Sequence, residues 1–409
     1  MSELIDVMFY LFLLITPFFS GLYFEKNFIV ASISLFMIMM LQIVYILKNK
    51  NKIKANENIV MVLKKICASF FIIFVISNFT YFYNYMFLEE SLELKLIALG
   101  NVQIVEMFLF CIVCILKNKK SIDSNELNFE YMIQNFVVIL SSTIISFLMF
   151  FEEFYREGRF EGTFYYANSL AIFLLITIIM IVESKVINLK SKKIEKAIKF
   201  FLVFLNLTAL ILTNSRFTYV LCIIYFSIKI VKLLKDKIRN KNVINFKRNI
   251  LLMMLGTSVL IIIAGCGFLK LVNKNEEINK RFQIETIIHD IKLRGSYLIE
   301  ANEIIKEYPL GLGYEGYLKH QEIKENKYRL RLVHNMPYQI TLNYGMVMLS
   351  FLAYCMYKYI VLMIKKKKLF NFINIILILT FLHSLVDIGT SFLVIDNLLI
   401  LLLLRNIID

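Results

Sequence analysis

The chain has 409 residues, of which 59% are hydrophobic and 19% are charged, and its mean hydropathy is +0.68. This apolar share is well above that of an ordinary soluble domain. The formal net charge of +15 does not indicate nucleic-acid binding, because the lysines gather in short loops between apolar segments, as in the cytoplasmic loops of membrane proteins. The composition therefore excludes both a soluble multidomain enzyme and a nucleic-acid-binding protein.

Apolar segments of about 20 residues recur along the chain, and this is the length that an α-helix needs to cross a bilayer core. We therefore predict an all-α membrane protein, a polytopic bundle of about 12 transmembrane helices that forms a single domain over residues 1–409. The N-terminus has no basic region and no small-residue cleavage site, so we expect the first span to be retained. The predicted spans cover residues 4–24, 28–47, 66–87, 95–116, 131–151, 164–183, 198–213, 217–235, 249–270, 336–364, 370–386 and 389–405.

Lysine and arginine orient the predicted spans. With the N-terminus inside, 28 basic residues lie on inner segments and 17 on outer ones. Most of the outer ones belong to one long loop, residues 271–335, and long loops contribute little to orientation. We therefore predict a protein of the cytoplasmic membrane with both termini in the cytoplasm. The loop at 271–335, between the ninth and tenth spans, is predicted to be extracytoplasmic and helical.

The two kinds of basic residue are distributed differently. Arginine makes up 3 of the 28 inner basic residues but 7 of the 17 outer ones. The guanidinium group binds phosphate or carboxylate with two parallel hydrogen bonds, which an ammonium group cannot do. This distribution favours an anionic ligand on the outer side, although ordinary ion pairs with nearby glutamates are an open alternative.

The long loop contains two amphipathic patterns and a glycine-rich segment. Apolar residues at helical spacing predict one helix from Ile284 to Ile291 and another from Tyr297 to Tyr308, which Pro309 ends. Both helices are expected on the membrane surface. Gly311 to Gly316 matches G-x-G-x-x-G, but a dinucleotide site needs a preceding strand and a following helix. We therefore predict a glycine-rich turn.

Two other features carry open alternatives. Glu106 lies in mid-span, where a carboxylate is either functional or a neutral acid that packs in the bundle. His383 and Asp387 are spaced to pair on one helix face, either to orient the imidazole or only to close the span. No His, Cys, Asp and Glu pattern is typical of a metal site, so neither a metal nor a cofactor is predicted.

Several short motifs follow one another in a fixed order. Together they resemble those of the O-antigen ligase and polymerase family of integral membrane glycosyltransferases, over roughly residues 156–390. The motifs are Arg159-Phe160-Glu161-Gly162-Thr163-Phe164, then Asn168-Ser169-Leu170-Ala171, Thr213-Asn214-Ser215-Arg216, Arg294 followed by Ala301 through Pro309-Leu310-Gly311-Leu312-Gly313, His334-Asn335 before Tyr338-Gln339 and Asn343-Tyr344-Gly345, and His383-Ser384 with Asp387.

The resemblance implies an enzyme that uses a glycan on a polyprenyl pyrophosphate at the outer face of the cytoplasmic membrane, and the lack of a metal-ligand pattern predicts that it is metal-independent. The acceptor glycan and the lipid bilayer are further partners, together with a flippase and a chain-length regulator. Carried over by motif, Arg216 and Arg294 would bind the pyrophosphate and His334 would act as a base on the acceptor hydroxyl. The remaining residues implied in substrate binding are Arg159, Asn168, Asn335, Tyr338, His383 and Asp387.

Two departures from the family pattern and two other functions accompany this prediction. The glycine expected shortly after Asn214-Ser215-Arg216 is absent, and Asn343 stands where the family often has an acidic residue. A ligase that moves the glycan to a lipid or cell-wall acceptor is one alternative. A polysaccharide or lipid transporter or flippase is the other, although the sequence shows neither the repeats nor the interrupted helices expected of one.

Overall fold

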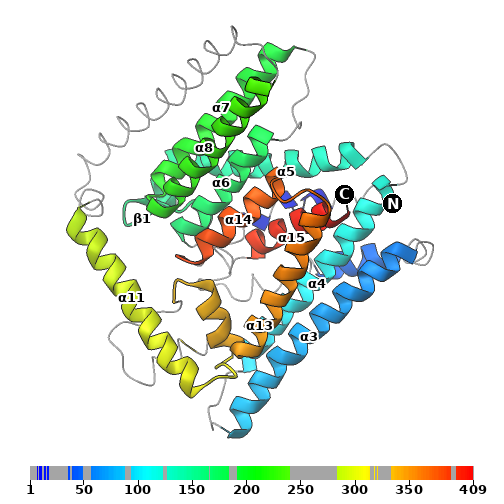
Figure 1. The fold of residues 1–409 in the computed structure, drawn as a ribbon, viewed down its shortest axis with the longest axis vertical. Helices are drawn as coiled ribbons and strands as arrows, with labels where there is room; N and C mark the ends of the chain where they lie inside the picture. The colour runs from blue at the N-terminus through cyan, green and yellow to red at the C-terminus, as the bar shows by residue number, and fades with distance from the viewer. Residues whose placement is uncertain are drawn as a thin grey trace. The chain divides into compact units, whose positions relative to one another are not determined.

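A computed structural model shows that the described residues are mostly helical, as predicted (Figure 1). The structure does not describe residues 240–282, so the predicted span at 249–270 lies outside the described residues. Most of the predicted span at 4–24 and part of the one at 28–47 lie outside them as well. The described residues are 57–87, 94–122, 127–164, 166–183, 191–239, 283–313, 333–387, 393–408, the helix at 39–48, and runs of one to three residues between 7 and 36 and at 317 and 320.

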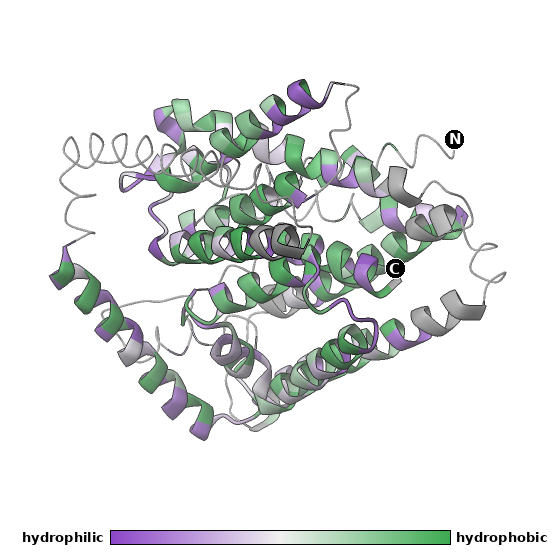
Figure 2. Ribbon diagram, turned by 45° about the horizontal axis from the view of Figure 1, so that its top comes forward, coloured by the Kyte–Doolittle hydropathy of each residue, from purple (hydrophilic) through white to green (hydrophobic). Residues whose placement is uncertain are grey.

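Among the described residues, only some of the predicted spans are helices long enough to cross a membrane. Among the described residues, three helices are long and apolar enough to cross a bilayer, over Lys64–Asn84, Tyr131–Phe150 and Met336–Lys365. Figure 2 shows that much of the described helical ribbon is coloured as hydrophobic residues, and on the helix over Lys64–Asn84 the residues Phe71 and Phe82 are 67% and 59% exposed. A helix that is apolar all round is typical of a membrane span. The full count of 12 spans stays a prediction.

The chain divides into two compact units, residues 1–134 with 290–409, and residues 135–289. In the first unit α3 (Glu57–Phe87) packs along α4 (Leu94–Ile122) and against α13 (Met336–Lys365). In turn, α15 (Leu393–Ile408) packs on α4 and on α14 (Phe372–Ser384). The predicted spans at 66–87, 95–116, 336–364 and 370–386 therefore fall on helices, and 389–405 does so from residue 393.

The second unit is built on α6 (Ala167–Glu183), which packs against both α7 (Lys192–Leu212) and α8 (Arg216–Arg239). The helix α5 (Leu127–Phe147) enters this unit after Gln134 and continues into the 3₁₀ turn η2 (Leu148–Phe150). A second 3₁₀ turn, η3 (Glu152–Phe154), follows it.

A small β-hairpin departs from the all-α prediction. The strands β1 (Tyr155–Arg156) and β2 (Arg159–Phe160) pair antiparallel, with Arg156 opposite Arg159. The turn consists of Glu157 and Gly158, both with positive φ (49° and 70°). Two such residues form the turn whose twist matches paired strands. The glycine was visible in the sequence, but two-residue strands are too short to give an alternating pattern.

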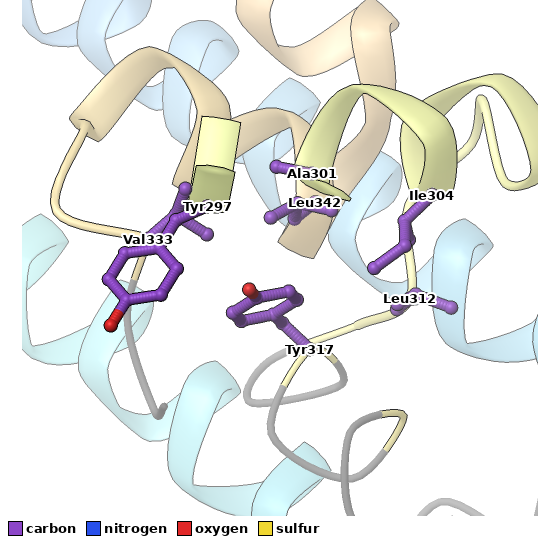
Figure 3. Close-up of a cluster of buried hydrophobic side chains, with 7 residues drawn as sticks. All are labelled: Tyr297, Ala301, Ile304, Leu312, Tyr317, Val333 and Leu342. Atoms are coloured by element: carbon purple, nitrogen blue, oxygen red, sulfur yellow. The ribbon is translucent and has the colours of Figure 1, made fainter. Parts of the chain in front are cut away.

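Within the described residues of the predicted outer loop, one long helix covers the segment where two helices were predicted. The helix α11 (Ile284–Glu307) runs through Gly295 without a break. Glycine weakens a helix by only about 1 kcal/mol, and a Cβ at this position would meet nothing within 4 Å. One face of α11 packs into a buried apolar cluster around the ring of Tyr317 (Figure 3). The cluster also contains Tyr297, Ala301, Ile304, Leu312, Val333 and Leu342.

The predicted glycine-rich turn is described only over Gly311–Gly313, where both glycines have a positive φ. This part packs into an interruption of α13. At Gly345 the backbone has φ 80° and ψ 173°, so the helix is broken there. The main-chain groups of Leu312 and Gly313 donate to the carbonyls of Leu342 and Asn343 at 2.6 and 2.8 Å. The expectation of uninterrupted helices is therefore wrong for α13, because a single glycine inside an apolar segment gives no sign of a break in the sequence.

Only glycine fits at this junction. A Cβ on Gly345 would lie 2.6 Å from the carbonyl carbon of Leu310, and one on Gly311 would lie 2.5 Å from the nitrogen of Gly345. From α3, Thr80 Oγ1 and Asn84 Nδ2 donate to the carbonyls of Leu310 and Gly311 at 2.9 and 3.1 Å. The polar groups exposed by the break are thus satisfied by neighbouring protein, as apolar surroundings require.

Candidate functional site

Three charged or titratable side chains meet in the first unit. His334 Nδ1 lies 3.0 Å from Asp387 Oδ1, and Arg294 Nη2 lies 3.5 Å from Asp387 Oδ2. Arg294 Nη1 also donates to the carbonyl of Val386 at 2.9 Å. Sequence separations of 53 and 92 residues show that the fold, not local spacing, makes this cluster. We refer to Arg294, His334 and Asp387 as the triad.

The start of α13 and the end of α14 hold the triad in place. His334 has a positive φ of 57°, a conformation that is uncommon for a residue other than glycine and that clusters at functional sites. Next to it, the Asn335 side chain caps α13 by accepting from Tyr338 N at 3.2 Å. The same side chain donates to the carbonyl of Leu385 at 2.8 Å. Asn335 therefore fixes the distance between His334 and Asp387.

The Asp387 carboxyl group is ionised at neutral pH. Burial alone would raise its pKa, since only 7% of the residue is exposed. The hydrogen bond from His334 and the charges of His334, His383 and Arg294 outweigh burial and hold the pKa of Asp387 well below its usual range. An ionised carboxylate can only accept a hydrogen bond, so Nδ1 of His334 donates the proton to it.

This assignment determines the chemistry of the imidazole. With its proton on Nδ1, neutral His334 carries a lone pair on Nε2. The side chain is 28% exposed, so it is accessible to a substrate. A histidine oriented by a carboxylate in this way is a general base for a hydroxyl group. Arg294, whose side chain is 37% exposed, places a fixed positive charge beside it.

The first unit thus brings together six predicted site residues from three segments, namely Arg294, His334, Asn335, Tyr338, His383 and Asp387. The sequence predicted Asp387 as a side-chain partner of His383, four residues away. In the structure Asp387 N donates to His383 O at 2.8 Å, and the carboxylate accepts from His334. The sequence missed the pairing of His334 with Asp387 because no periodicity connects residues 53 positions apart.

The other three predicted site residues lie in the second unit. Arg159 Nε donates to the carbonyl of Thr213 at 2.9 Å, and its Nη2 donates to Asn168 Oδ1 at 2.6 Å. Arg216 is half-buried at the first position of α8. The preceding Asn214 has a φ of 52°, which asparagine tolerates better than most residues. The two arginine motifs are thus neighbours of one another at the start of α6 and the end of α7.

Over the described ranges no group of three or more His, Cys, Asp or Glu side chains is placed to hold a metal ion. The expectation of a metal-independent site stays a prediction. Neither models of protein families nor characterised proteins match this sequence. The triad and the motif order therefore carry the functional assignment.

Proposed function

We propose that this protein is a membrane glycosyltransferase of the O-antigen polymerase type that joins polyprenyl-pyrophosphate-linked oligosaccharide units. The observation that carries the proposal is the hydrogen bond of 3.0 Å between His334 Nδ1 and Asp387. It leaves Nε2 of a partly exposed histidine as a base next to an arginine. Transfer of a sugar from a pyrophosphate to a hydroxyl requires these two functions, proton removal and stabilisation of a negative leaving group.

In the proposed reaction His334 Nε2 accepts the proton of the acceptor hydroxyl as the oxygen attacks the anomeric carbon of the donor. Asp387 keeps the imidazole in the required tautomer and stabilises the imidazolium that forms, as a buried carboxylate does in other catalytic histidine pairs. The bond between the sugar and the pyrophosphate breaks on the opposite side, so the anomeric configuration is inverted. No covalent enzyme intermediate is needed.

Arg294 serves the leaving group in this scheme. Negative charge grows on the bridging oxygen as the bond breaks, and a fixed guanidinium group stabilises that charge more in the transition state than in the ground state. Two of its nitrogens face Val386 and Asp387, and a guanidinium group has five N–H donors. Donors therefore remain for phosphate oxygens. The pyrophosphate role of Arg216 rests on the resemblance alone.

The direct test uses purified protein in liposomes with a lipid-linked oligosaccharide as both donor and acceptor, in excess chelator. We expect a ladder of longer lipid-linked glycans, resolved on a gel. If elongation is lost with chelator and restored by magnesium, the arginine-only scheme is wrong. A single transfer to a lipid or cell-wall acceptor, without a ladder, would identify the ligase alternative instead.

The transporter alternative is favoured by one observation, the interruption of α13 at Gly345. Broken helices in transporters use the freed carbonyls to bind ions or substrates. Here the carbonyls of Leu342 and Asn343 accept from Leu312 and Gly313, which favours a structural break. Movement of a labelled lipid-linked glycan across liposomes, without any new glycosidic bond, would support the transporter.

The proposal also requires the triad to face the outer side of the cytoplasmic membrane. A cysteine introduced at Lys324, in the predicted outer loop, is expected to react with an impermeant thiol reagent in intact cells. A cysteine at Lys193, at the start of α7, is expected to react only after the cells are opened. The reverse labelling would place the triad in the cytoplasm, where this donor would not be presented.

A further inference from the structure

A buried carboxylate in the first unit is not used by the proposed reaction. Glu106 is 0% exposed and lies on α4, roughly 18 Å along the helix axis from Leu94. It occupies the middle of the apolar segment Gly100–Leu116. A charged side chain at such a depth is costly, and by default it pairs with another group or marks an ion pathway. Its partners are therefore informative.

Two amide side chains point at Glu106 from two other helical segments. Gln42 Nε2, on the helix at 39–48, lies 3.1 Å from Glu106 Oε1. Asn397 Nδ2, on α15, lies 3.2 and 3.4 Å from the two carboxylate oxygens. Within the described part of the chain, no lysine, arginine or histidine forms an ion pair with Glu106. The negative charge is therefore not balanced by a basic side chain there.

The oxygen atoms of the same two amides are left over. Gln42 and Asn397 are 7% and 2% exposed, and among the described residues Gln42 Oε1 and Asn397 Oδ1 have no hydrogen-bond partner. Buried polar atoms are normally satisfied. The oxygen and nitrogen of an amide are nearly equal in shape, and their assignment follows the surroundings. If each amide turns over, both oxygens face the point where the carboxylate lies.

We propose that Glu106, Gln42 and Asn397 form a binding site for a sodium ion inside the helix bundle. Carboxylate and amide oxygens are the ligands that hard cations prefer. A cation that holds oxygens at about 2.3–2.6 Å places neighbouring ligands about 3.3–3.7 Å apart when they lie at right angles. This separation is close to the 3.1–3.4 Å between the amide ends and the carboxylate.

The charge of the site and its two amide oxygens favour a monovalent cation such as sodium over a divalent cation or a proton. The three side chains carry one negative charge in total, which a monovalent cation neutralises, whereas a divalent cation would leave an excess. A proton on Glu106 would satisfy only one of the two amide oxygens, whereas a cation is shared by both. Asp396, next to Asn397, is close enough to Glu106 for an electrostatic interaction, and a neutral carboxyl group at Asp396 keeps the charge of the site at one.

The test compares chloride salts of sodium, potassium and choline at equal ionic strength, with chelator present to remove divalent metals. The midpoint of thermal aggregation of the purified protein in detergent is the readout. A ligand that binds only the folded state raises this midpoint with its concentration, so we expect sodium to raise it by about 2–5 °C with saturation. Potassium and choline should give smaller, non-saturating changes.

Two variants and one direct measurement complete the test. Glu106→Gln should abolish the sodium response, and the control Glu303→Gln, at an exposed position of α11, should retain it. Because Glu106→Gln can fail to fold, binding of radioactive sodium to the unchanged protein is measured as well. An equal response to all three salts, or no bound sodium, would show that Glu106 is a neutral packing acid and overturn the proposal. None of these outcomes depends on glycosyltransferase activity.

Discussion

Two arginines that the sequence assigned to substrate binding are held in different ways. In the first unit Arg294 contacts the carboxylate of Asp387, which also orients His334. In the second unit Arg159 donates to a main-chain carbonyl and to the neutral side chain of Asn168, at 2.9 and 2.6 Å. These bonds join β2 to the end of α7 and the start of α6.

Arg294 is therefore placed for a role in the reaction, whereas Arg159 is placed to hold parts of the fold together. A carboxylate next to a histidine and an arginine gives a base and a fixed positive charge. An arginine bonded to neutral oxygens of two other elements holds those elements together. The arginines of two predicted site motifs therefore differ in role, and substitutions in the two units can test this difference.

The largest effect is expected from His334→Ala. Removal of a general base typically lowers the rate by about 10²–10⁴, while donor binding should persist because Arg294 is unchanged. Glycan elongation by purified protein measures the rate, and retention of radiolabelled donor measures binding. The matched control is His289→Ala, at an exposed position of α11, which should elongate normally.

Normal glycan length in the His334→Ala variant, at equal expression, would show that this residue is not the base. His383 would then be the next candidate. It lies one helical turn before Asp387 and is only 1% exposed, so a substrate would reach it only after a local rearrangement.

A somewhat smaller loss is expected from Asp387→Asn. The amide keeps the shape of the side chain but does not hold His334 in the same tautomer with a negative charge, and in a comparable catalytic histidine pair this change cost about 10⁴ in rate. Here we expect a loss of about 10–10³, because the His334 side chain is 28% exposed and can adopt the required tautomer in contact with water. The double variant with His334→Ala should be no slower than His334→Ala alone. Fully additive losses would mean that Asp387 acts independently of the histidine.

The sequence predicted helices far better than it predicted contacts. Apolar runs located α3, α4, α13 and α14 because composition alone identifies a membrane-compatible helix. The hairpin at 155–160 and the break at Gly345 were not predicted, since each depends on one or two glycines whose φ is set by neighbours. The order of the motifs predicted that His334 and Asp387 belong to one site, but their hydrogen bond is visible only in the folded structure.

Gly345→Ala tests whether the first unit depends on the break in α13. The new Cβ would lie 2.6–2.7 Å from three atoms of Leu310, and a positive φ costs an ordinary residue about 1–3 kcal/mol. We expect a lower midpoint of thermal aggregation and reduced activity, because the start of the helix carries His334. Gly295→Ala is the control. Its Cβ enters open space, so it should stabilise α11 by about 0.5–1 kcal/mol. Equal behaviour of the two variants would contradict the close packing at Gly345.

Arginine-to-lysine changes compare the two units directly. Lysine keeps the charge but loses the planar fork. Arg294→Lys should lower donor use by about tenfold, because one or two charge-assisted hydrogen bonds are lost, with little change in stability. Arg159→Lys should lower stability by about 1–3 kcal/mol and leave the activity of the folded fraction near normal. A loss of donor binding in folded Arg159→Lys protein would show that Arg159 also contacts the substrate.

The smallest expected effect is a difference in pH dependence between the two clusters. The pKa of Asp387 is held below its usual range by His334 and the neighbouring charges, against the effect of burial. A carboxyl group with a lowered pKa contributes stability that is fully present above its unfolded pKa, about 3.9, and that is lost as the pH falls through the folded pKa.

The stability difference between the unchanged protein and Asp387→Asn should therefore be constant from pH 7 to pH 5 and should shrink below about pH 4. The part of the Arg159→Lys difference that comes from the bonds of Arg159 to Thr213 and Asn168 should stay constant over the whole range, because both acceptors are neutral. Aggregation midpoints of the three proteins in one buffer series measure both differences. A constant difference for Asp387→Asn down to pH 2.5 would mean that the carboxylate does not gain its stability from ionisation, and the tautomer assigned to His334 would lose its support.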